Sequence, residues 1–316
     1  MGSGERALRS ISPVAAGKAA APAQHKLLFV MVPKGIHPYF IPVYEGFKAA
    51  ARHFGVQVEM DAPPTFDVSL QVKVIEDLIA RGVDGIAISA DDDAGLVAVV
   101  HQAVQAGIKV ITFDAPAPST EALTYIGTNN RAAGYEAGEW MARAMGYRGK
   151  VAILQGGLEA TNLNLRTEGF REALARVAPA IHVTGVIDEK GDFSTSVIKT
   201  EKLLADTRDL HGIFSVSAEG APAAATVVRE EGRKGQVVIA GFDDLPDTLT
   251  GIRDGTIAFC VVQNTYAMGW LSVERLLDAV DGRPIPKFID TGVIFVDKRN
   301  VETYTQRMRK EPVGLR

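Results

Sequence analysis

Polar side chains follow apolar runs of strand length at several points in the sequence. Asp114 follows Val110-Ile111-Thr112-Phe113, and Asp243 ends the run that begins at Val237. In an open parallel sheet the ligand crevice lies beyond the carboxyl ends of the strands, so polar or aromatic residues at these ends are candidates for ligand contact. The candidates found in this way are His37, Tyr39, Phe40, Ser89, Asp114, Ser217, Asp243 and Gln263.

Asp114 and Asp243 occupy corresponding places in the two halves of the chain. Two carboxylates that face each other across a crevice are suited to a ligand rich in hydroxyl groups, because each carboxylate oxygen accepts hydrogen bonds. An aspartate after a strand can also be only a helix cap or a turn residue. The paired placement favours the binding interpretation without excluding the structural one.

Signatures of catalysis, cofactors and metals are absent from the sequence. It contains no GxxxxGK[ST], no GxGxxG after the first strand, no HExxH and no GxSxG. The run Asp91-Asp92-Asp93 stands at a helix start, where capping accounts for it better than metal binding does. The single cysteine, Cys260, lies within an apolar run and is expected to be buried. We therefore predict no cofactor and no metal.

Apolar runs alternate with segments of helical periodicity along most of the chain. Strands that are apolar on both faces and separated by helices predict a parallel sheet covered by helices on both sides. We expect a polar tail after the last strand. Strands are expected at 26–32, 56–60, 85–89, 109–113, 151–154, 181–187, 212–216, 237–242, 256–262 and 288–295, and helices at 38–54, 67–81, 93–106, 131–145, 163–177, 194–205, 221–231, 245–253 and 267–280.

The stretch Thr124 to Asn130 divides the chain, because the strand-helix alternation runs before it and starts again after it. The predicted fold class is α/β, with two doubly wound parallel-sheet lobes joined by a three-strand hinge. Further crossings are expected near Gln263 and near Asp290, since there are more elements after residue 256 than the second lobe needs. The expected parts are a disordered leader (1–25), an N-terminal lobe (26–128 plus 264–290) and a C-terminal lobe (129–263 plus 291–316).

Composition excludes some classes of partner. The 316 residues carry a net charge of −4, which gives no polycationic surface for a nucleic acid backbone. No run approaches the roughly 18 apolar residues of a membrane helix, and residues 1–25 lack the apolar core of a signal peptide. A small molecule bound between the lobes is the expected partner.

Several motifs together resemble the type I periplasmic solute-binding proteins of ABC transporters, in the branch similar to ribose-binding and related sugar-binding proteins. The resemblance covers about residues 26 to 297. It rests on His37-Pro38-Tyr39-Phe40, Val110 to Asp114, Arg166-Thr167-Glu168-Gly169-Phe170, Asp192-Phe193, Gly241-Phe242-Asp243 and Gln263.

The resemblance implies a role for each matching position. Tyr39, Phe40 and Phe193 would cover the apolar faces of a sugar ring, since C–H surfaces suit aromatic rings. Asp114, Arg166, Asp243 and Gln263 would hydrogen-bond its hydroxyls. The family further implies a monomeric periplasmic protein without catalytic activity, which delivers a sugar or polyol to permease subunits.

Some positions depart from the ribose-binding pattern. Family members that bind ribose carry asparagine where His37 and Ser89 stand, arginine where Ala115 stands, and an asparagine-aspartate pair where Ser217-Ala218 stands. Because short side chains replace long polar ones, a bulkier or differently hydroxylated ligand, or one held through water, is expected in place of ribose.

Three alternative functions share features with this sequence. A transcriptional regulator of the lactose-repressor type would need a helix-turn-helix ahead of the lobes, which the Ala- and Pro-rich residues 1–25 do not supply. An enzyme could use the strand-end carboxylates for acid–base chemistry. A receptor for chemotaxis or quorum signals on the same fold stays open on the sequence alone.

Overall fold

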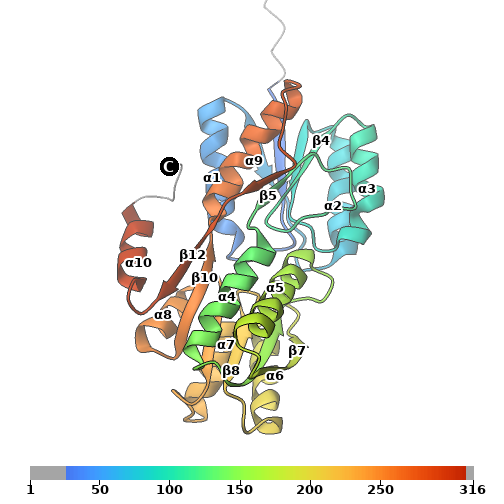
Figure 1. Ribbon diagram of the computed structural model, residues 1–316. Coiled ribbons are helices and arrows are strands. Elements are labelled where there is room, and N and C mark those ends of the chain that lie inside the picture. The colour runs from blue at the N-terminus through green and yellow to red at the C-terminus, as the bar shows by residue number, and fades with distance from the viewer. Residues whose placement is uncertain (1–25, 311–316) are drawn as a thin grey trace, which may run out of the picture.

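The computed structural model describes residues 26–310, and the predicted leader at 1–25 lies outside this range. Two six-stranded sheets form the body of the molecule, each covered by helices on both faces (Figure 1). The two lobes are stacked end to end in the view of Figure 1, with the blue-to-cyan elements in the upper lobe and the green-to-yellow elements in the lower one. The predicted fold class is confirmed.

Sheet A has the strand order β11-β5-β4-β3-β1-β2, and every neighbouring pair is parallel. Alternate residues of its strands point to opposite faces, and both faces are buried: Phe29 and Met31 pack against α1 and α9, whereas Val30 and Val32 pack against α2 and α3. Its elements are β1 (Leu28–Val32), α1 (Phe40–Phe54), β2 (Gln57–Met60), α2 (Val68–Arg81), β3 (Gly85–Ile88), α3 (Asp93–Gln105), β4 (Lys109–Phe113), β5 (Tyr125–Gly127), α9 (Thr265–Val280) and β11 (Phe288–Asp290).

Sheet B has the order β12-β10-β9-β8-β6-β7, and only the β10–β12 pair is antiparallel. Its two faces are likewise buried, one against α4 and α5 and the other against α6, α7, α8 and α10. Its elements are α4 (Asn130–Ala144), β6 (Gly149–Gln155), α5 (Thr161–Val177), β7 (Ile181–Asp188), α6 (Phe193–Asp206), β8 (Gly212–Ser215), α7 (Gly220–Glu230), β9 (Val238–Phe242), α8 (Pro246–Asp254), β10 (Ile257–Gln263), β12 (Val293–Asp297) and α10 (Val301–Lys310).

The chain passes between the sheets three times: after β5, after β10 and between β11 and β12. The single strand predicted at 288–295 is wrong, because Gly292, at φ 71°, separates two short strands that belong to different sheets. Two further elements were missed: β5 lies within the dividing stretch, and α10 replaces the start of the predicted polar tail. The exact lobe boundaries given above stay a prediction.

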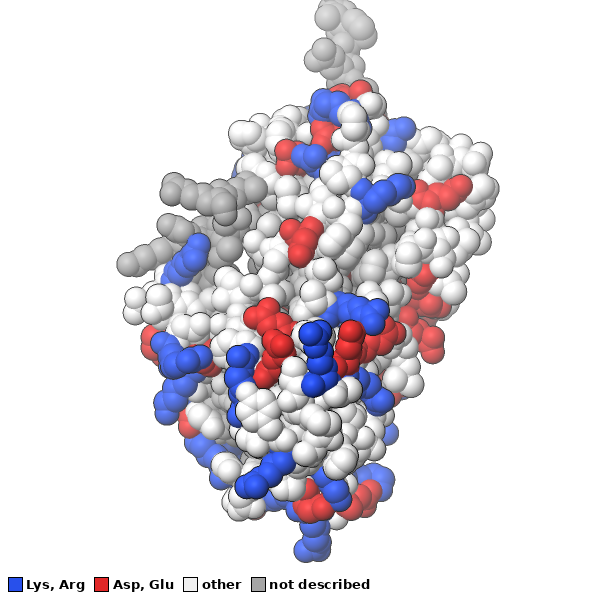
Figure 2. Space-filling view, viewed as in Figure 1, with Lys and Arg blue, Asp and Glu red and all other residues white. Residues whose placement is uncertain are grey.

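Charged residues of both signs are interspersed on the face shown in Figure 2, without an extended area of one sign. None of the helices within residues 26–310 is long and apolar enough to span a membrane.

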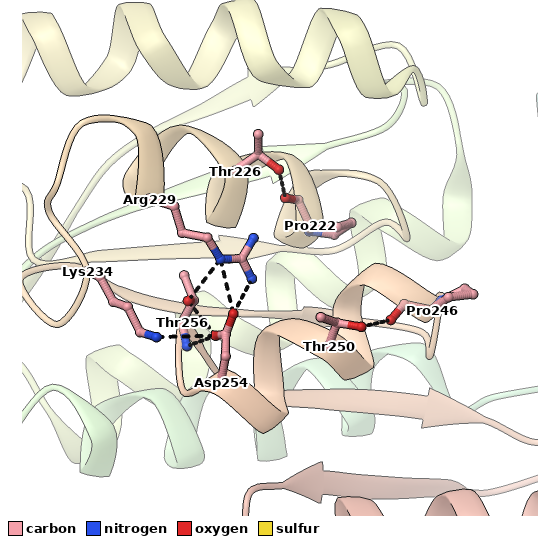
Figure 3. A network of polar contacts seen from close by, with 8 residues as sticks. All are labelled: Pro222, Thr226, Arg229, Lys234, Pro246, Thr250, Asp254 and Thr256. Atoms are coloured by element: carbon pink, nitrogen blue, oxygen red, sulfur yellow. Dashed lines mark hydrogen bonds and ion pairs between the residues drawn. The ribbon is translucent and has the colours of Figure 1, made fainter.

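A polar network joins α7, α8 and the start of β10 at the base of sheet B (Figure 3). The Asp254 carboxylate accepts hydrogen bonds from Arg229 Nη2 at 2.8 Å and from the Thr256 amide at 2.8 Å, and Lys234 Nζ lies 3.6 Å away. Partial burial alone would raise the pKa of Asp254, but the hydrogen bonds from Thr256 and the charge of Arg229 outweigh it and lower the pKa. The ionised form of Asp254 therefore stabilises this corner of the lobe.

The change Asp254→Asn is expected to lower the free energy of unfolding by about 1 kcal/mol at pH 7, because the side chain is over a third exposed and water screens its ion pairs. Since the folded pKa is lowered, the stabilisation is present above the unfolded value near 3.8 and is lost as the pH falls through the folded value. Denaturant unfolding at pH 7 and at pH 3 measures both effects.

The control is Asp206→Asn, which removes only the exposed ion pair with Lys202 one helical turn away. It should change the free energy of unfolding by less than about 0.5 kcal/mol. An equal loss in the two variants would contradict the role assigned to the Asp254 network.

Candidate ligand-binding site

A cavity of about 260 Å³ lies between the carboxyl ends of the strands of the two sheets. This is slightly below the roughly 300–1,000 Å³ typical of drug-sized ligands, so it suits a small ligand. Eight of the ten predicted site residues line it: His37, Tyr39, Phe40, Asp114, Arg166, Ser217, Asp243 and Gln263.

Ser89 and Phe193 lie outside the cavity lining. Ser89 is fully buried beneath the site, where its hydroxyl donates to Asp114 Oδ2 at 2.6 Å. Phe193 begins α6 and is 40% exposed. An aromatic residue that does line the cavity is Phe66, in the loop between β2 and α2. Phe66 therefore supplies aromatic surface at the cavity from the lobe of sheet A, and the role expected for Phe193 stays a prediction.

Asp114 directly follows β4 and has a left-handed backbone, with φ at 58°. This conformation is uncommon for a residue other than glycine and turns the chain sharply at the strand end. Tyr39 donates its hydroxyl to Asp114 Oδ1 at 2.8 Å, and Ser89 donates to the other oxygen. The two donors fix the carboxylate in one orientation at the edge of sheet A.

Asp243 repeats this arrangement in sheet B, since it follows β9 and has φ at 65°. Gln263 Nε2 donates to Asp243 Oδ1 at 2.9 Å, while Oδ2 accepts no hydrogen bond from any described residue. Burial raises the pKa of Asp243 to about 7, although Arg166 and the hydrogen bond from Gln263 act against the rise. The site therefore holds a carboxyl group with one oxygen that has no hydrogen-bond donor among the described residues.

Arg166, on α5, is 1% exposed and is the largest of the fully buried side chains. Its Nε donates to Asn130 Oδ1 at 2.8 Å, its Nη1 donates to the Val216 carbonyl at 2.9 Å, and its guanidinium lies 4.0 Å from the ring centre of Phe242. Its Nη2 is buried without a hydrogen-bond partner among the described residues. The guanidinium is thus held firmly in the cavity wall with part of its donor capacity unused.

The close approach of α4 and α5 sets the position of Arg166. A Cβ added at Gly134 of α4 would lie 2.2 Å from the Arg166 carbonyl oxygen, and one added at Gly169 of α5 would lie 2.0 Å from the Arg131 carbonyl oxygen. Only glycine allows the two backbones to approach this closely. The two glycines thus hold α5, with Arg166, directly against α4, which carries Asn130.

Two polar contacts join the lobes across the cavity. Lys34 Nζ donates to Asn162 Oδ1 at 3.0 Å, and the imidazole of His37 pairs with the carboxylate of Glu219. Burial alone would lower the pKa of His37, but the hydrogen bond and charge of Glu219, together with Asp243 and Asp114, raise it. The structure therefore has the lobes in contact over the cavity, as in a closed state.

Several lining residues were missed by the sequence analysis, among them Lys34, Phe66, Asp91, Asn162 and Glu219. Lys34 and Glu219 follow β1 and β8, so the strand-end rule could have found them. Nothing in the local pattern marks Asn162, which lies in the first turn of α5.

The acidic run before α3 is divided between two roles. Asp92 caps α3 by accepting from the amides of Ala94 and Gly95, which confirms the capping interpretation for this residue. Asp91 lines the cavity, and burial raises its pKa although the charge of Lys34 acts in the other direction. Within the described part of the chain, no group of three or more His, Cys, Asp or Glu side chains is placed to hold a metal ion.

Comparison with known proteins identifies the family. The model of the periplasmic binding protein domain matches residues 28–284. A crystal structure of an ABC transporter solute-binding protein from Burkholderia graminis, in complex with D-arabinose, is 41% identical, with a TM-score of 0.85 over 88% of this chain and 97% of that one. One from Agrobacterium vitis, bound with α-D-tagatopyranose, is 26% identical, with a TM-score of 0.84 over 87% and 96%.

A D-ribose/D-allose-binding protein of Pseudomonas aeruginosa is 25% identical over 91% of this chain and 92% of its own length. The chain therefore belongs to the periplasmic binding protein family, among the sugar-binding proteins of ABC transporters. The resemblance and the general function predicted from the sequence are confirmed. These relatives are sugar-binding or solute-binding proteins.

Gly134→Ala is expected to lower the free energy of unfolding by about 1–3 kcal/mol, because the added methyl group overlaps the backbone of α5 and forces the two helices apart. Thermal or denaturant unfolding measures the loss. Gly185→Ala in β7 is the matched control, since a Cβ there meets nothing within 4 Å, and it should change stability by less than about 0.5 kcal/mol. A neutral Gly134→Ala would show that α4 and α5 separate without cost.

Proposed function

We propose that this protein captures a neutral monosaccharide of five or six carbons in the cavity between its lobes and presents the closed form to the permease of an ABC transporter. The single observation that carries the proposal is the buried Arg166 guanidinium, whose Nη2 has no partner among the described residues. Leaving such a donor unpaired costs free energy, so the site is built for a ligand oxygen at this position.

The chemistry of the cavity suits a polyhydroxyl ligand. The carboxylates of Asp114 and Asp243 accept hydrogen bonds from hydroxyl groups, and Arg166 donates to a ring or hydroxyl oxygen. Tyr39, Phe40 and Phe66 supply aromatic surface for the apolar faces of a ring. Positive and negative groups both line the cavity, which favours a neutral ligand over a charged one.

D-arabinose is the first candidate, since the solute-binding protein from Burkholderia graminis that was solved with it is 41% identical to this chain. The positions where His37 and Ser217 replace the long polar side chains of ribose binders both line the cavity. They are the positions at which we expect selectivity among stereoisomers to arise.

Closure follows from the division of the site between the lobes. Asp114 and Tyr39 belong to the lobe of sheet A, whereas Arg166 and Asp243 belong to that of sheet B, so one ligand can contact all four only when the lobes meet. No bond is made or broken in this cycle.

We assign the lobes the boundaries given above and propose that the protein works as a monomer in the periplasm, without a nucleic acid partner.

A thermal-shift screen against pentoses, hexoses, polyols and inositols tests the function. A sugar that binds only the folded protein raises the melting temperature, by the equivalent of about 2.7 kcal/mol at a hundredfold excess over Kd. We expect a rise for one stereochemical group that includes D-arabinose. If no sugar shifts the transition while a different class of solute does, the sugar proposal is wrong.

Asp243→Asn should weaken sugar binding by about 10- to 100-fold at pH 8, the range of a hydrogen bond to a charged group. Ligand hydroxyls favour the ionised carboxylate, and the pKa of Asp243 in the empty protein is about 7. Wild-type affinity should therefore rise as the pH increases from 6 to 8, and the variant should lose that part of the rise. Calorimetric titration measures both.

Asp206→Asn on the exposed side of α6 is the control and should leave affinity unchanged at every pH. Equal affinities of wild type and Asp243→Asn at pH 8 would remove Asp243 from the binding site.

A further inference from the structure

Glu189 is a fully buried carboxyl group beneath the cavity wall, next to the end of β7. It receives hydrogen bonds from two serines: Ser217 donates to Oε1, and Ser196 of α6 donates to Oε2 at 2.8 Å. A Cβ at Gly220, the first residue of α7, would lie 2.5 Å from Oε2, so the carboxyl lies against the start of that helix. Glu189 does not line the cavity, whereas Ser217 does.

The contacts of Ser217 restrict what it can offer to a ligand. A hydroxyl has one hydrogen to donate, and that of Ser217 points to Glu189. The nearby hydroxyl of Ser215 lies 3.4 Å from Ser217 Oγ, but it has a single hydrogen, which it donates to the Ser217 carbonyl in the shorter contact of 2.8 Å. With Glu189 ionised, Ser217 therefore faces the cavity as a hydrogen-bond acceptor.

We propose that Glu189 is a positioning residue that makes Ser217 an acceptor for a ligand hydroxyl, and so selects ligands with a donor at that point. The inference rests on the proposed function and adds a residue that never touches the ligand. When Glu189 is protonated, its carboxyl O–H can donate to Ser217 Oγ instead. The Ser217 hydrogen is then free to point into the cavity, so Ser217 becomes a hydrogen-bond donor to the ligand.

The surroundings of Glu189 allow this exchange near neutral pH. Burial raises the pKa of Glu189 to about 7, the hydrogen bonds from Ser217 and Ser196 act against the rise, and the charges of Glu219 and Asp188 add to it. These two acidic neighbours are themselves paired, Glu219 with His37 and Asp188 with Lys190. Both forms of Glu189 are thus accessible between pH 6 and 8.

A double-mutant cycle tests the proposal, with Glu189→Gln, Ser217→Ala and the double variant titrated with the best-binding sugar at pH 6 and pH 8. Glutamine keeps the size of the side chain, and Ser196 can still donate to the Asp192 carbonyl, 2.9 Å away. At pH 8, Glu189→Gln should weaken binding about three- to tenfold, the size of one ordinary hydrogen bond. At pH 6, where the wild-type carboxyl is mostly protonated, the loss should fall below about twofold.

In the Ser217→Ala background, Glu189→Gln should change affinity by less than about twofold at either pH. An equal loss in both backgrounds, a loss that does not depend on pH, or tighter binding by Glu189→Gln would each overturn the proposal. A wild-type protein that binds no sugar would instead refute the proposed function, so this titration is done first.

If Glu189→Gln does not fold, proton release on binding replaces the cycle. Calorimetry of wild type and Ser217→Ala at pH 7, in two buffers of different ionisation enthalpy, gives the number of protons released. A ligand hydroxyl bonded to Ser217 favours ionised Glu189, so wild type should release more protons than Ser217→Ala. Equal release would overturn the proposal.

Discussion

The buried guanidinium of Arg166 is the constraint around which the site is arranged. A charge in a closed cavity is costly unless hydrogen bonds compensate it, and here Asn130 and the Val216 carbonyl do so only in part, since Nη2 has no partner among the described residues. The empty closed state thus carries an unpaired donor and, in Asp243, a carboxylate oxygen without a donor. Both groups belong to the lobe of sheet B, so a ligand that supplies a partner to each removes these costs, and in the proposed function its further contacts to Asp114 and Tyr39 of the other lobe favour the closed state.

Hydrogen bonds connect the site around Arg166 to the segments in which the chain crosses between the lobes. Asn130, which holds Arg166, also donates to the Tyr125 hydroxyl at 3.0 Å, and the Tyr125 hydroxyl in turn donates to the Asp114 carbonyl at 2.8 Å. Gln263 binds Asp243 with its Nε2 and accepts from Thr128 with its Oε1, so two hinge segments meet at one amide. The orientation of the groups that line the cavity therefore depends on the geometry of the crossing segments.

The sequence predicted the strand-end positions well, because apolar runs that stop at Asp114 and Asp243 have few other meanings in a parallel sheet. It placed a crossing near Asp290 but took Phe288 to Phe295 as one strand, since only Asp290-Thr291-Gly292 interrupts that run. Glu189 was missed because three consecutive charged residues, Asp188-Glu189-Lys190, are typical of a solvent-exposed turn. Only the folded structure shows that Glu189 contacts Ser217. Asn162 lines the cavity only because of how the chain folds, so hydrophobic periodicity in the sequence could not identify it.

Asp243 and His37 line the same cavity, and a change in pH has opposite effects on their contributions. In the proposed site, ionised Asp243 accepts hydrogen bonds from ligand hydroxyls, and with its pKa raised to about 7 this contribution grows as the pH rises through neutrality. The pair of His37 and Glu219 joins the two lobes, and because the pKa of His37 is raised in the closed form, its contribution is complete at low pH and is lost as the pH rises through that raised value. A rise in pH therefore strengthens the contribution of Asp243 and weakens that of the His37–Glu219 pair. Because the carboxyl group of Asp243 and the imidazole of His37 lie on facing lobes, the pH dependence of closure combines two opposing titrations.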